Sequence, residues 1–300
     1  MARPARPLPD PFPGKSFSVA TARAYGIPRT RTRANDLLRP HHGVRSPAGV
    51  VLPFGHQCAA LQTRLPDCAA FSHVTAARLH DLPLPLRLEN TVLFDVIVPR
   101  GTRAPRGKLV RGHQSQLQPA EVDTRTRVPA TTPERTFCDL ASMLTLAELV
   151  AVGDVILRRG GTRARDRLTR MVAAHASRKY RRVLRRALEL LDGRSESPKE
   201  SELRVLLIES GFTTPAVNPR VFDAAGVLVG RVDLAYPALK IAIEYEGDQH
   251  REDKQQWRKD LQRRRRLEAL GWIYLPVTQS DLDDPTALFA DLRSALARRS

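Results

Sequence analysis

Three carboxylates in the last third of the chain stand where a strand would be expected to carry other side chains. Asp233 lies within Arg231–Ala235, and Glu244 and Glu246 end the apolar run that begins at Ile241. Strand interiors disfavour carboxylates, so these positions indicate a function. Residues two apart share one face of a strand, which places Glu244 and Glu246 side by side.

The pairing of two strands decides whether Asp233 joins them. We expect Ala235 to pair with Lys240 across an even-length loop. Asp233 then lies opposite Ala242, next to Glu244 and on its face. Three acidic groups at one sheet edge repel each other unless a divalent cation sits among them. Oxygen ligands with no cysteine nearby favour Mg²⁺ or Mn²⁺ over zinc. The alternative is an exposed sheet face whose carboxylates are balanced by nearby basic side chains.

The elements that must position these carboxylates form an αβββαβα order over residues 197–300. Helices are predicted at 198–209, 253–270 and 285–296, and strands at 217–222, 227–235, 240–245 and 272–277, with a hairpin turn at 223–226. Ser197 can cap the first helix, with Pro198 at its first position. The fold class expected is α/β, or α+β over the whole chain.

A family resemblance rests on these motifs. They are Gly230-Arg231-Val232-Asp233, Glu244-Tyr245-Glu246-Gly247-Asp248-Gln249-His250, Glu200, Asp260 and Gly271-Trp272. Over roughly residues 197 to 280 they resemble domain of unknown function 559, which is similar to very-short-patch repair endonucleases of the PD-(D/E)XK superfamily. The fold implied is that of restriction endonucleases. The pattern departs at Glu246, where the motif usually has Lys.

The resemblance implies a metal-dependent DNA endonuclease that hydrolyses phosphodiester bonds. Asp233 and Glu244 would hold Mg²⁺ or Mn²⁺, and Glu246 would orient or deprotonate the attacking water. Glu200 would reach the same site directly or through water. A domain that keeps this shape and binds DNA without cutting is the alternative, because Glu246 replaces the Lys.

The residues after Glu246 have supporting roles in this interpretation. His250 would donate a proton to the leaving oxygen or contact a phosphate, and Gln249 would position it. Asp248 would be a partner outside the first ligand shell. A hydrogen-bonded structural histidine explains His250 almost equally well.

Charge is concentrated at the front of the chain. The sequence has 49 Lys and Arg against 32 Asp and Glu, a net charge of +17. Residues 198–300 hold 16 basic and 16 acidic residues, so the whole surplus lies in residues 1–197. Such a surplus favours a polyanionic partner, DNA first, with RNA not excluded and no membrane. The alternative is charge that serves solubility.

The N-terminal segment has the rhythm of a helix-turn-helix. After a disordered basic arm at 1–15, helices are predicted at Ser18–Tyr25 and Thr30–Leu38, and residues 41–45 would begin a wing. Two short helices joined by a glycine turn are also common without DNA. The DNA-binding candidates, including two from the C-terminal domain, are Arg29, Arg31, Arg33, Arg258 and Arg263.

The middle of the chain is a mixed α/β and helical region. A strand at 91–98 is expected to pair with 108–114 around the turn at 101–107. Helices follow at 146–157 and 178–191, and polar, small residues at 192–197 predict a domain boundary. The domains expected are therefore 16–50, 51–192 and 197–300, after the arm at 1–15.

A second resemblance covers roughly residues 15 to 160. The segments Phe17–Arg45, His73–Leu79 and Thr131–Ala141 resemble the winged-helix and adjoining region of AbiEi-type antitoxins of type IV toxin-antitoxin systems. Such antitoxins are DNA-binding autorepressors. The competing function is therefore a transcriptional regulator that carries an inactive nuclease-like domain, with a cognate toxin or a repair protein as partner.

Several classes are excluded or left without support. Three cysteines without a CxxC pair support neither a disulfide framework nor a zinc ribbon. No apolar run is long enough to span a membrane, and no apolar segment follows the N-terminal arginines, so a cytoplasmic protein is expected. The remaining histidines form no ligand-spaced cluster and are assigned no site: His41, His42, His73, His80, His113 and His175.

Overall fold

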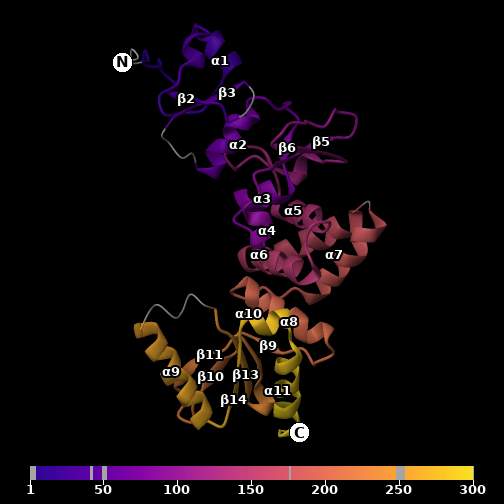
Figure 1. The fold of residues 1–300 in the computed structure, drawn as a ribbon. Coiled ribbons are helices and arrows are strands. Elements are labelled where there is room, and N and C mark those ends of the chain that lie inside the picture. Colours follow the sequence, from indigo (N-terminus) through magenta and orange to yellow (C-terminus); the bar gives the residue numbers. More distant parts are fainter. Residues whose placement is uncertain (1–4, 41–42, 49–52, 176, 248–253, 300) are drawn as a thin grey trace. The chain divides into compact units, whose positions relative to one another are not determined.

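The computed structural model describes residues 5–40, 43–48, 53–175, 177–247 and 254–299, with the backbone alone at 254–259. The chain forms two compact units, Met1–Asp139 and Leu140–Ser300 (Figure 1). Each combines sheets with helices, which is the α/β class that the sequence predicts.

The first unit begins with a small three-stranded sheet. Its elements are β1 (Phe17–Ser18), α1 (Val19–Ala24), β2 (Leu37–Leu38) and β3 (Val44–Pro47), and β3 is the central strand. The Ser18 side chain accepts a hydrogen bond from Thr21 N and caps α1 as predicted. Phe12 is buried in this small core, with its ring 5.0 Å from that of Phe17. The expected disordered arm is therefore wrong at Phe12, because an aromatic side chain can be buried there.

The predicted helix at Thr30–Leu38 is wrong. Residues Arg31–Arg33 form a single 3-10 turn, and Leu37 and Leu38 pair with β3. Short helices gain little from local propensity, and Thr, Asn and Asp in this stretch favour turns, so strand pairing prevails. Among described residues 5–40 and 43–48, α1 is therefore the one α-helix, and none of them forms a recognition helix for a DNA groove.

A five-stranded sheet forms the rest of the first unit. Its elements are α2 (Phe54–Gln62), β4 (Ala70–Phe71), α3 (His73–Leu79), α4 (Leu86–Glu89), β5 (Phe94–Pro99), β6 (Val110–Ser115), β7 (Val122–Asp123), β8 (Ala130–Thr131) and α5 (Pro133–Leu140). The strand order is β6-β5-β4-β8-β7. Its core joins α2 and α3 to β4, β5 and β8 around Phe71.

The expected pairing of β5 with β6 is present, but the strands run parallel. A hairpin turn was expected between them. Residues 100–109 instead return along the sheet before β6 begins, as a parallel pair requires. This connection lies close against β6, because a Cβ at Gly112 would be 2.1 Å from Pro105 O.

The second unit begins with three helices, of which two precede the boundary expected at 192–197 and the third directly follows it. They are α6 (Leu146–Ala174), which is interrupted at Gly161, α7 (Arg178–Leu190) and α8 (Pro198–Glu209). Helix α6 packs against both of the others. Buried Arg204 donates to Asp154 Oδ2 at 2.6 Å, and Asp192 N donates to Asp154 Oδ1 at 2.7 Å. These buried contacts keep the polar segment 192–197 inside one unit.

The C-terminal elements follow the predicted αβββαβα order. After α8 come β9 (Ala216–Val217), β10 (Arg220–Phe222), β11 (Leu228–Arg231), β12 (Leu234–Tyr236), β13 (Ile241–Tyr245), α9 (Lys254–Ala269), β14 (Ile273–Val277), α10 (Gln279–Asp283) and α11 (Thr286–Ala297). The first two predicted strands are each divided. One part enters the sheet β14-β13-β12-β9, and the other forms the hairpin β10-β11.

Alternating side chains give this sheet two covered faces. Leu234, Tyr236, Ile241 and Ile243 form a core with α8 and α11. Ala235 and Ala242 point to the opposite face, where Leu267 of α9 packs. Figure 1 shows α9 and α11 on opposite sides of the strands. Side chains in register with the alanines therefore face α9.

Candidate active site and nucleic-acid interface

The strand register brings Asp233 level with Glu244. Leu234 pairs with Ile243 and Ala235 with Ala242, so Asp233, just before β12, stands opposite Glu244. The expected position opposite Ala242 is wrong by two residues, but a shift of two keeps the same face. Tyr245 N donates to Asp233 Oδ2 at 2.9 Å, which holds the carboxylate beside the end of β13.

Helix α8 contributes Glu200 from its first turn. Ser197 Oγ accepts from Glu200 N at 3.1 Å, so the helix begins as predicted. The Glu200 carboxylate is buried, and its Oε2 accepts from Glu196 N at 2.8 Å and from Asn218 Nδ2 at 2.7 Å. Asn218 has a φ of 49° at the break between β9 and β10, which is a conformation that asparagine tolerates.

Glu200 and Asp233 line one cleft of about 490 Å³, whereas Glu244 contacts it through Arg263, which is part of the lining. Its walls come from α8, the β10-β11 hairpin and α9: Glu196, Glu200, Asn218, Val229, Arg231, Asp233, Asp260, Gln262, Arg263 and Arg266. Burial, with the negative charges of Glu200 and Glu244, raises the pKa of Asp233 to about 7 against the opposing effect of the Tyr245 N–H. Asp233 is therefore a carboxyl group that can gain or lose a proton near neutral pH.

Glu244 is neutralised by a side chain of α9. Arg263 Nη1 and Nη2 each donate to the Glu244 carboxylate at 2.6 Å. The Tyr274 hydroxyl lies 3.0 Å from Glu244 Oε2 and 3.2 Å from Glu246 Oε1. Burial raises the pKa of Glu244, while the bonds from Arg263 oppose that shift. The cation beside Glu244 in this structure is an arginine.

Gly230 makes room for this arginine. A Cβ at Gly230 would lie 2.7 Å from Arg263 Cδ and 3.1 Å from its Cγ. The Arg263 side chain crosses the glycine on its way to Glu244, and its Nη1 also donates to Arg231 O at 2.8 Å. The glycine of the Gly230-Arg231-Val232-Asp233 motif thus serves the Glu244–Arg263 ion pair.

The carboxylates fit a hard divalent cation in chemical type but only partly in placement. Asp233 and Glu200 bring oxygen donors to the cleft, whereas both oxygens of Glu244 already accept from Arg263. Within the described residues, no three carboxylates of this cleft have oxygens within 4.8 Å of one another. A cation could be bound by Asp233 and Glu200 first. Glu244 could become its third ligand only after the Glu244 carboxylate had left Arg263.

The other predicted residues of this site have different outcomes. Glu246 is exposed at the end of β13, near Tyr274. Arg263, expected to contact DNA, is engaged with Glu244 instead. Asp248, Gln249 and His250 lie outside the described residues, as does the side chain of Arg258, so their predicted roles remain predictions.

A second cleft, in the first unit, is lined by basic side chains. It has a volume of about 850 Å³ and lies between the small N-terminal sheet, α2 and the segment before β6. Its cationic residues, which we call the basic groove, are Arg29, Arg33, Arg39, Arg45, Arg64, Arg106 and Lys108. Its lining includes no Asp or Glu within the described part of the chain.

The predicted DNA-binding arginines are divided by this groove. Arg29 and Arg33 line it, although no recognition helix carries them. Arg31 does not line it, because its Nη1 and Nη2 donate to Asp36 at 2.8 and 2.7 Å. Burial and the neighbouring charges of Arg39 and Arg33 lower the pKa of Arg45. That repulsion would be relieved by an anion in the groove.

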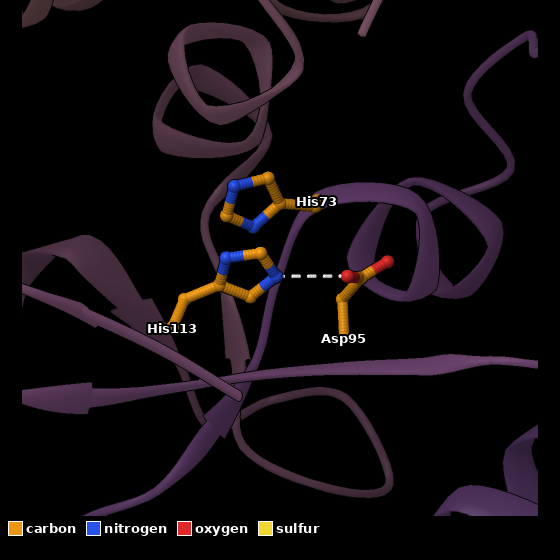
Figure 2. Close-up of side chains that lie close together, drawn as sticks. All are labelled: His73, Asp95 and His113. Atoms are coloured by element: carbon orange, nitrogen blue, oxygen red, sulfur yellow. Dashed lines mark hydrogen bonds and ion pairs between the residues drawn. The ribbon is translucent and has the colours of Figure 1, made fainter. Parts of the chain in front are cut away.

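Two features were not predicted from the sequence: most of the basic groove, and a cluster of His73, Asp95 and His113. Figure 2 shows the two imidazole rings stacked beside the Asp95 carboxylate, with centroids 3.8 Å apart. His113 Nε2 lies 2.8 Å from Asp95 Oδ1. Burial and the neighbouring His113 lower the pKa of His73 to about 3, so its ring is neutral. No local spacing signalled the cluster, because its members come from three elements.

No helix in the described residues is both long enough and apolar enough to cross a lipid bilayer.

Two proteins of Mycobacterium tuberculosis are similar to this chain. They are the uncharacterized proteins MT2308 of strain CDC 1551 / Oshkosh and Rv2248 of strain H37Rv, each 29% identical over 211 residues. The similarity covers 70% of this chain and 76% of each relative. Because 211 residues exceed the length of either unit, it includes parts of both. No family model and no solved structure matches the chain, so the two family resemblances remain interpretations of its motifs.

Proposed function

We propose that the protein is a metal-dependent DNA endonuclease whose basic N-terminal unit binds the substrate. The observation that carries the proposal is that Glu200 and Asp233 line one cleft and that Glu244 stands opposite Asp233 on the neighbouring strand. Gathering carboxylates in a partly buried cleft costs free energy, and functional sites are where such arrangements concentrate.

Asp233 and Glu200 have the oxygen chemistry to hold Mg²⁺ or Mn²⁺. A cation there would supply Lewis-acid stabilisation of the charge that develops on the phosphate. Glu246, exposed at the end of β13, is suited to orient or deprotonate the attacking water. Arg263 would contact a phosphate oxygen once it leaves Glu244, since guanidinium groups bind both anions well.

The basic groove supports the nucleic-acid part of the proposal. Seven cationic side chains without a lining carboxylate attract a polyanion, and phosphate contacts release counterions. Such contacts do not distinguish DNA from RNA. DNA is the proposed substrate because the motifs around Asp233 and Glu244 resemble those of DNA endonucleases.

A second function is favoured by the Glu244–Arg263 ion pair and by Glu246 in place of the motif lysine. An arginine that neutralises Glu244 makes a cation unnecessary for stability there. The protein would then be a DNA-binding transcriptional regulator, as the antitoxin resemblance implies, with a nuclease-like domain that does not cut. A cognate toxin or a repair protein is the partner that this function would require.

Cleavage of supercoiled plasmid separates the two functions. The full chain is incubated at about 100 mM salt, because phosphate contacts weaken steeply above that level, with Mg²⁺, Mn²⁺ or EDTA. Asp233→Asn removes the charge of the proposed ligand, and Asp291→Asn, at an exposed position of α11, is the matched control. A single-stranded RNA is tested in parallel under the same conditions.

We expect nicking with Mg²⁺ or Mn²⁺ that EDTA and Asp233→Asn abolish and Asp291→Asn retains. Plasmid that is bound but intact in every lane would favour the regulator. Nicking that persists in Asp233→Asn would reject the proposed site, and cutting of RNA alone would change the substrate class.

A further inference from the structure

We propose that His73, Asp95 and His113 form a binding site for a borderline divalent metal ion such as Zn²⁺. The site lies in the first unit and uses none of the residues of the carboxylate cleft. It therefore goes beyond the proposed nuclease function and does not depend on it.

The ligand atoms are already gathered. One atom from each of the three side chains lies within 4.8 Å of the other two. Zinc ligands at about 2.0–2.2 Å from a tetrahedral ion lie roughly 3.3 Å from one another. The His113 Nε2–Asp95 Oδ1 separation of 2.8 Å must therefore widen by about half an ångström. Because an imidazole lone pair lies in the plane of its ring, at least one of the two stacked rings must also turn toward the ion, which is a change of side-chain torsion.

Three separate elements hold the ligands. In the parallel pairing of β5 with β6, Asp95 stands opposite Arg111 and Ile97 opposite His113, so Asp95 and His113 share one face. His73 reaches them from the start of α3, with a φ of 46°. A non-glycine residue in that conformation is strained, and such strain concentrates at functional sites.

The surroundings suit a metal ligand set. Asp95 has no exposed side-chain surface, and Arg111 donates to both of its oxygens, at 2.5 and 3.0 Å. A carboxylate offers about four lone-pair sites, so Arg111 leaves room for another partner while it orients the group. The His113 side chain retains 25% of its exposure, which provides access for an ion.

The donor set decides the class of ion. Two imidazole nitrogens and one carboxylate oxygen suit zinc and its neighbours, whereas Mg²⁺ prefers oxygen ligands alone. The ion would take the place of the hydrogen between His113 Nε2 and Asp95 Oδ1, and the ring would then carry its proton on Nδ1. Zn²⁺ binding can thus distinguish this site from the cleft, because the described lining of the cleft offers oxygen ligands and no imidazole.

The test measures zinc bound to the EDTA-treated and dialysed full chain by competition with a chromogenic chelator. His113→Gln keeps a hydrogen-bond donor toward Asp95 but removes the imidazole. His73→Asn keeps a residue that tolerates positive φ. His56→Ala is the matched control, since His56 is exposed on α2. Circular dichroism and melting without metal establish that each variant folds.

We expect the wild type and His56→Ala to bind one equivalent of Zn²⁺ more than either site variant, or at least about 10-fold more tightly. Zinc should raise the Tm of the wild type and of His56→Ala but not that of the two site variants. Mg²⁺ should not compete with zinc for the site. The Co²⁺ complex should lack a thiolate charge-transfer band, because the ligand set contains no cysteine. Equal zinc binding in all four proteins, or such a band, would overturn the proposal.

Discussion

The basic groove of the first unit and the carboxylate cleft of the second handle charge in opposite ways. Seven cationic residues line the groove, and no acidic residue joins them in its described lining. In the cleft, Arg263 pairs with Glu244, Arg231 with Glu196 and Arg266 with Asp223. A cluster of like charges attracts an external ion of opposite charge. A charge that is already paired binds an external ion only after it has left its partner. The comparison favours substrate binding in one unit and ion-dependent chemistry in the other.

The largest effect is expected from breaking the ion pair of the cleft. Arg263→Gln leaves Glu244 buried without its cation, which should lower the free energy of unfolding in EDTA by about 3 kcal/mol. Mn²⁺ should recover most of that loss if a divalent ion can replace the guanidinium. Urea unfolding with EDTA and with Mn²⁺ measures both changes.

Arg186→Gln is the control for this variant, because Arg186 pairs with Glu189 and Glu209 at the surface and none of the three lines the cleft. Its cost should stay below about 1 kcal/mol, as for other surface ion pairs. Equal losses in the two variants, or no response to Mn²⁺, would show that the cleft is not poised to exchange its cation.

Neutralising the groove should weaken DNA binding without changing the cleft. The triple change Arg33→Gln, Arg39→Gln and Arg64→Gln removes three phosphate contacts, so we expect about 100-fold weaker binding and a salt dependence shallower by about 2.7 in slope. Fluorescence anisotropy across a salt series measures both. Arg31→Gln, whose guanidinium pairs with Asp36, should bind as the wild type. A loss as large in Arg31→Gln would move the interface out of the groove.

The titration of Asp233 gives the cleft a pH signature that the groove lacks. Its pKa rises from 3.8 to about 7 on folding, so the stability gained from its proton is present below about pH 4 and is lost as the pH rises through 7. The Asn side chain of Asp233→Asn stays neutral at every pH. In EDTA at pH 8, the free energy of unfolding of this variant should therefore exceed that of the wild type by at least about 1 kcal/mol. Urea unfolding of both proteins at pH 4.5 and pH 8 tests this pH dependence. If the difference in free energy of unfolding were the same at both pH values, the titration of Asp233 would not be its cause.

The smallest effect should come from Gly230→Ala. The new Cβ would lie 2.7 Å from Arg263 Cδ, and a flexible side chain can shift to avoid it. We expect a loss below about 1 kcal/mol, because only the aim of Arg263 is disturbed. In a protein that already carries Arg263→Gln, Gly230→Ala should then lower the free energy of unfolding by almost nothing further. A full additive loss in that double variant would show that Gly230 acts independently of Arg263.

Local patterns predicted much of the C-terminal fold. Ser197 and Pro198 mark the start of α8, and the hairpin turn at 223–226 is where residue types favour it. The pairing of β12 with β13 was predicted two residues away from its true register. Residues Pro237–Leu239 form a 3-10 turn that ends at Lys240 with a φ of 51°, so the four-residue loop lies one position later in the chain.

The first unit was harder to predict because its elements are short. Leu37 and Leu38 carry no local mark of a strand, and they become one only by pairing with Ser46 and Pro47 of β3. The basic groove depends on the same long-range contacts, since it joins residues near position 30 to residues near position 108. Arg29 and Arg33 were therefore identified as candidates for the wrong structural reason.

The sequence by itself determined that Asp233 and Glu244 share one face of a sheet. Strand side chains alternate with a period of two, and a register error of two residues leaves that result unchanged. Only the tertiary structure decided that Arg263 neutralises Glu244, that Arg31 is withdrawn from the groove by Asp36, and that His73 meets Asp95 and His113. Periodicity is a property of neighbouring residues along the chain, whereas the partner of a charge depends on how distant elements pack.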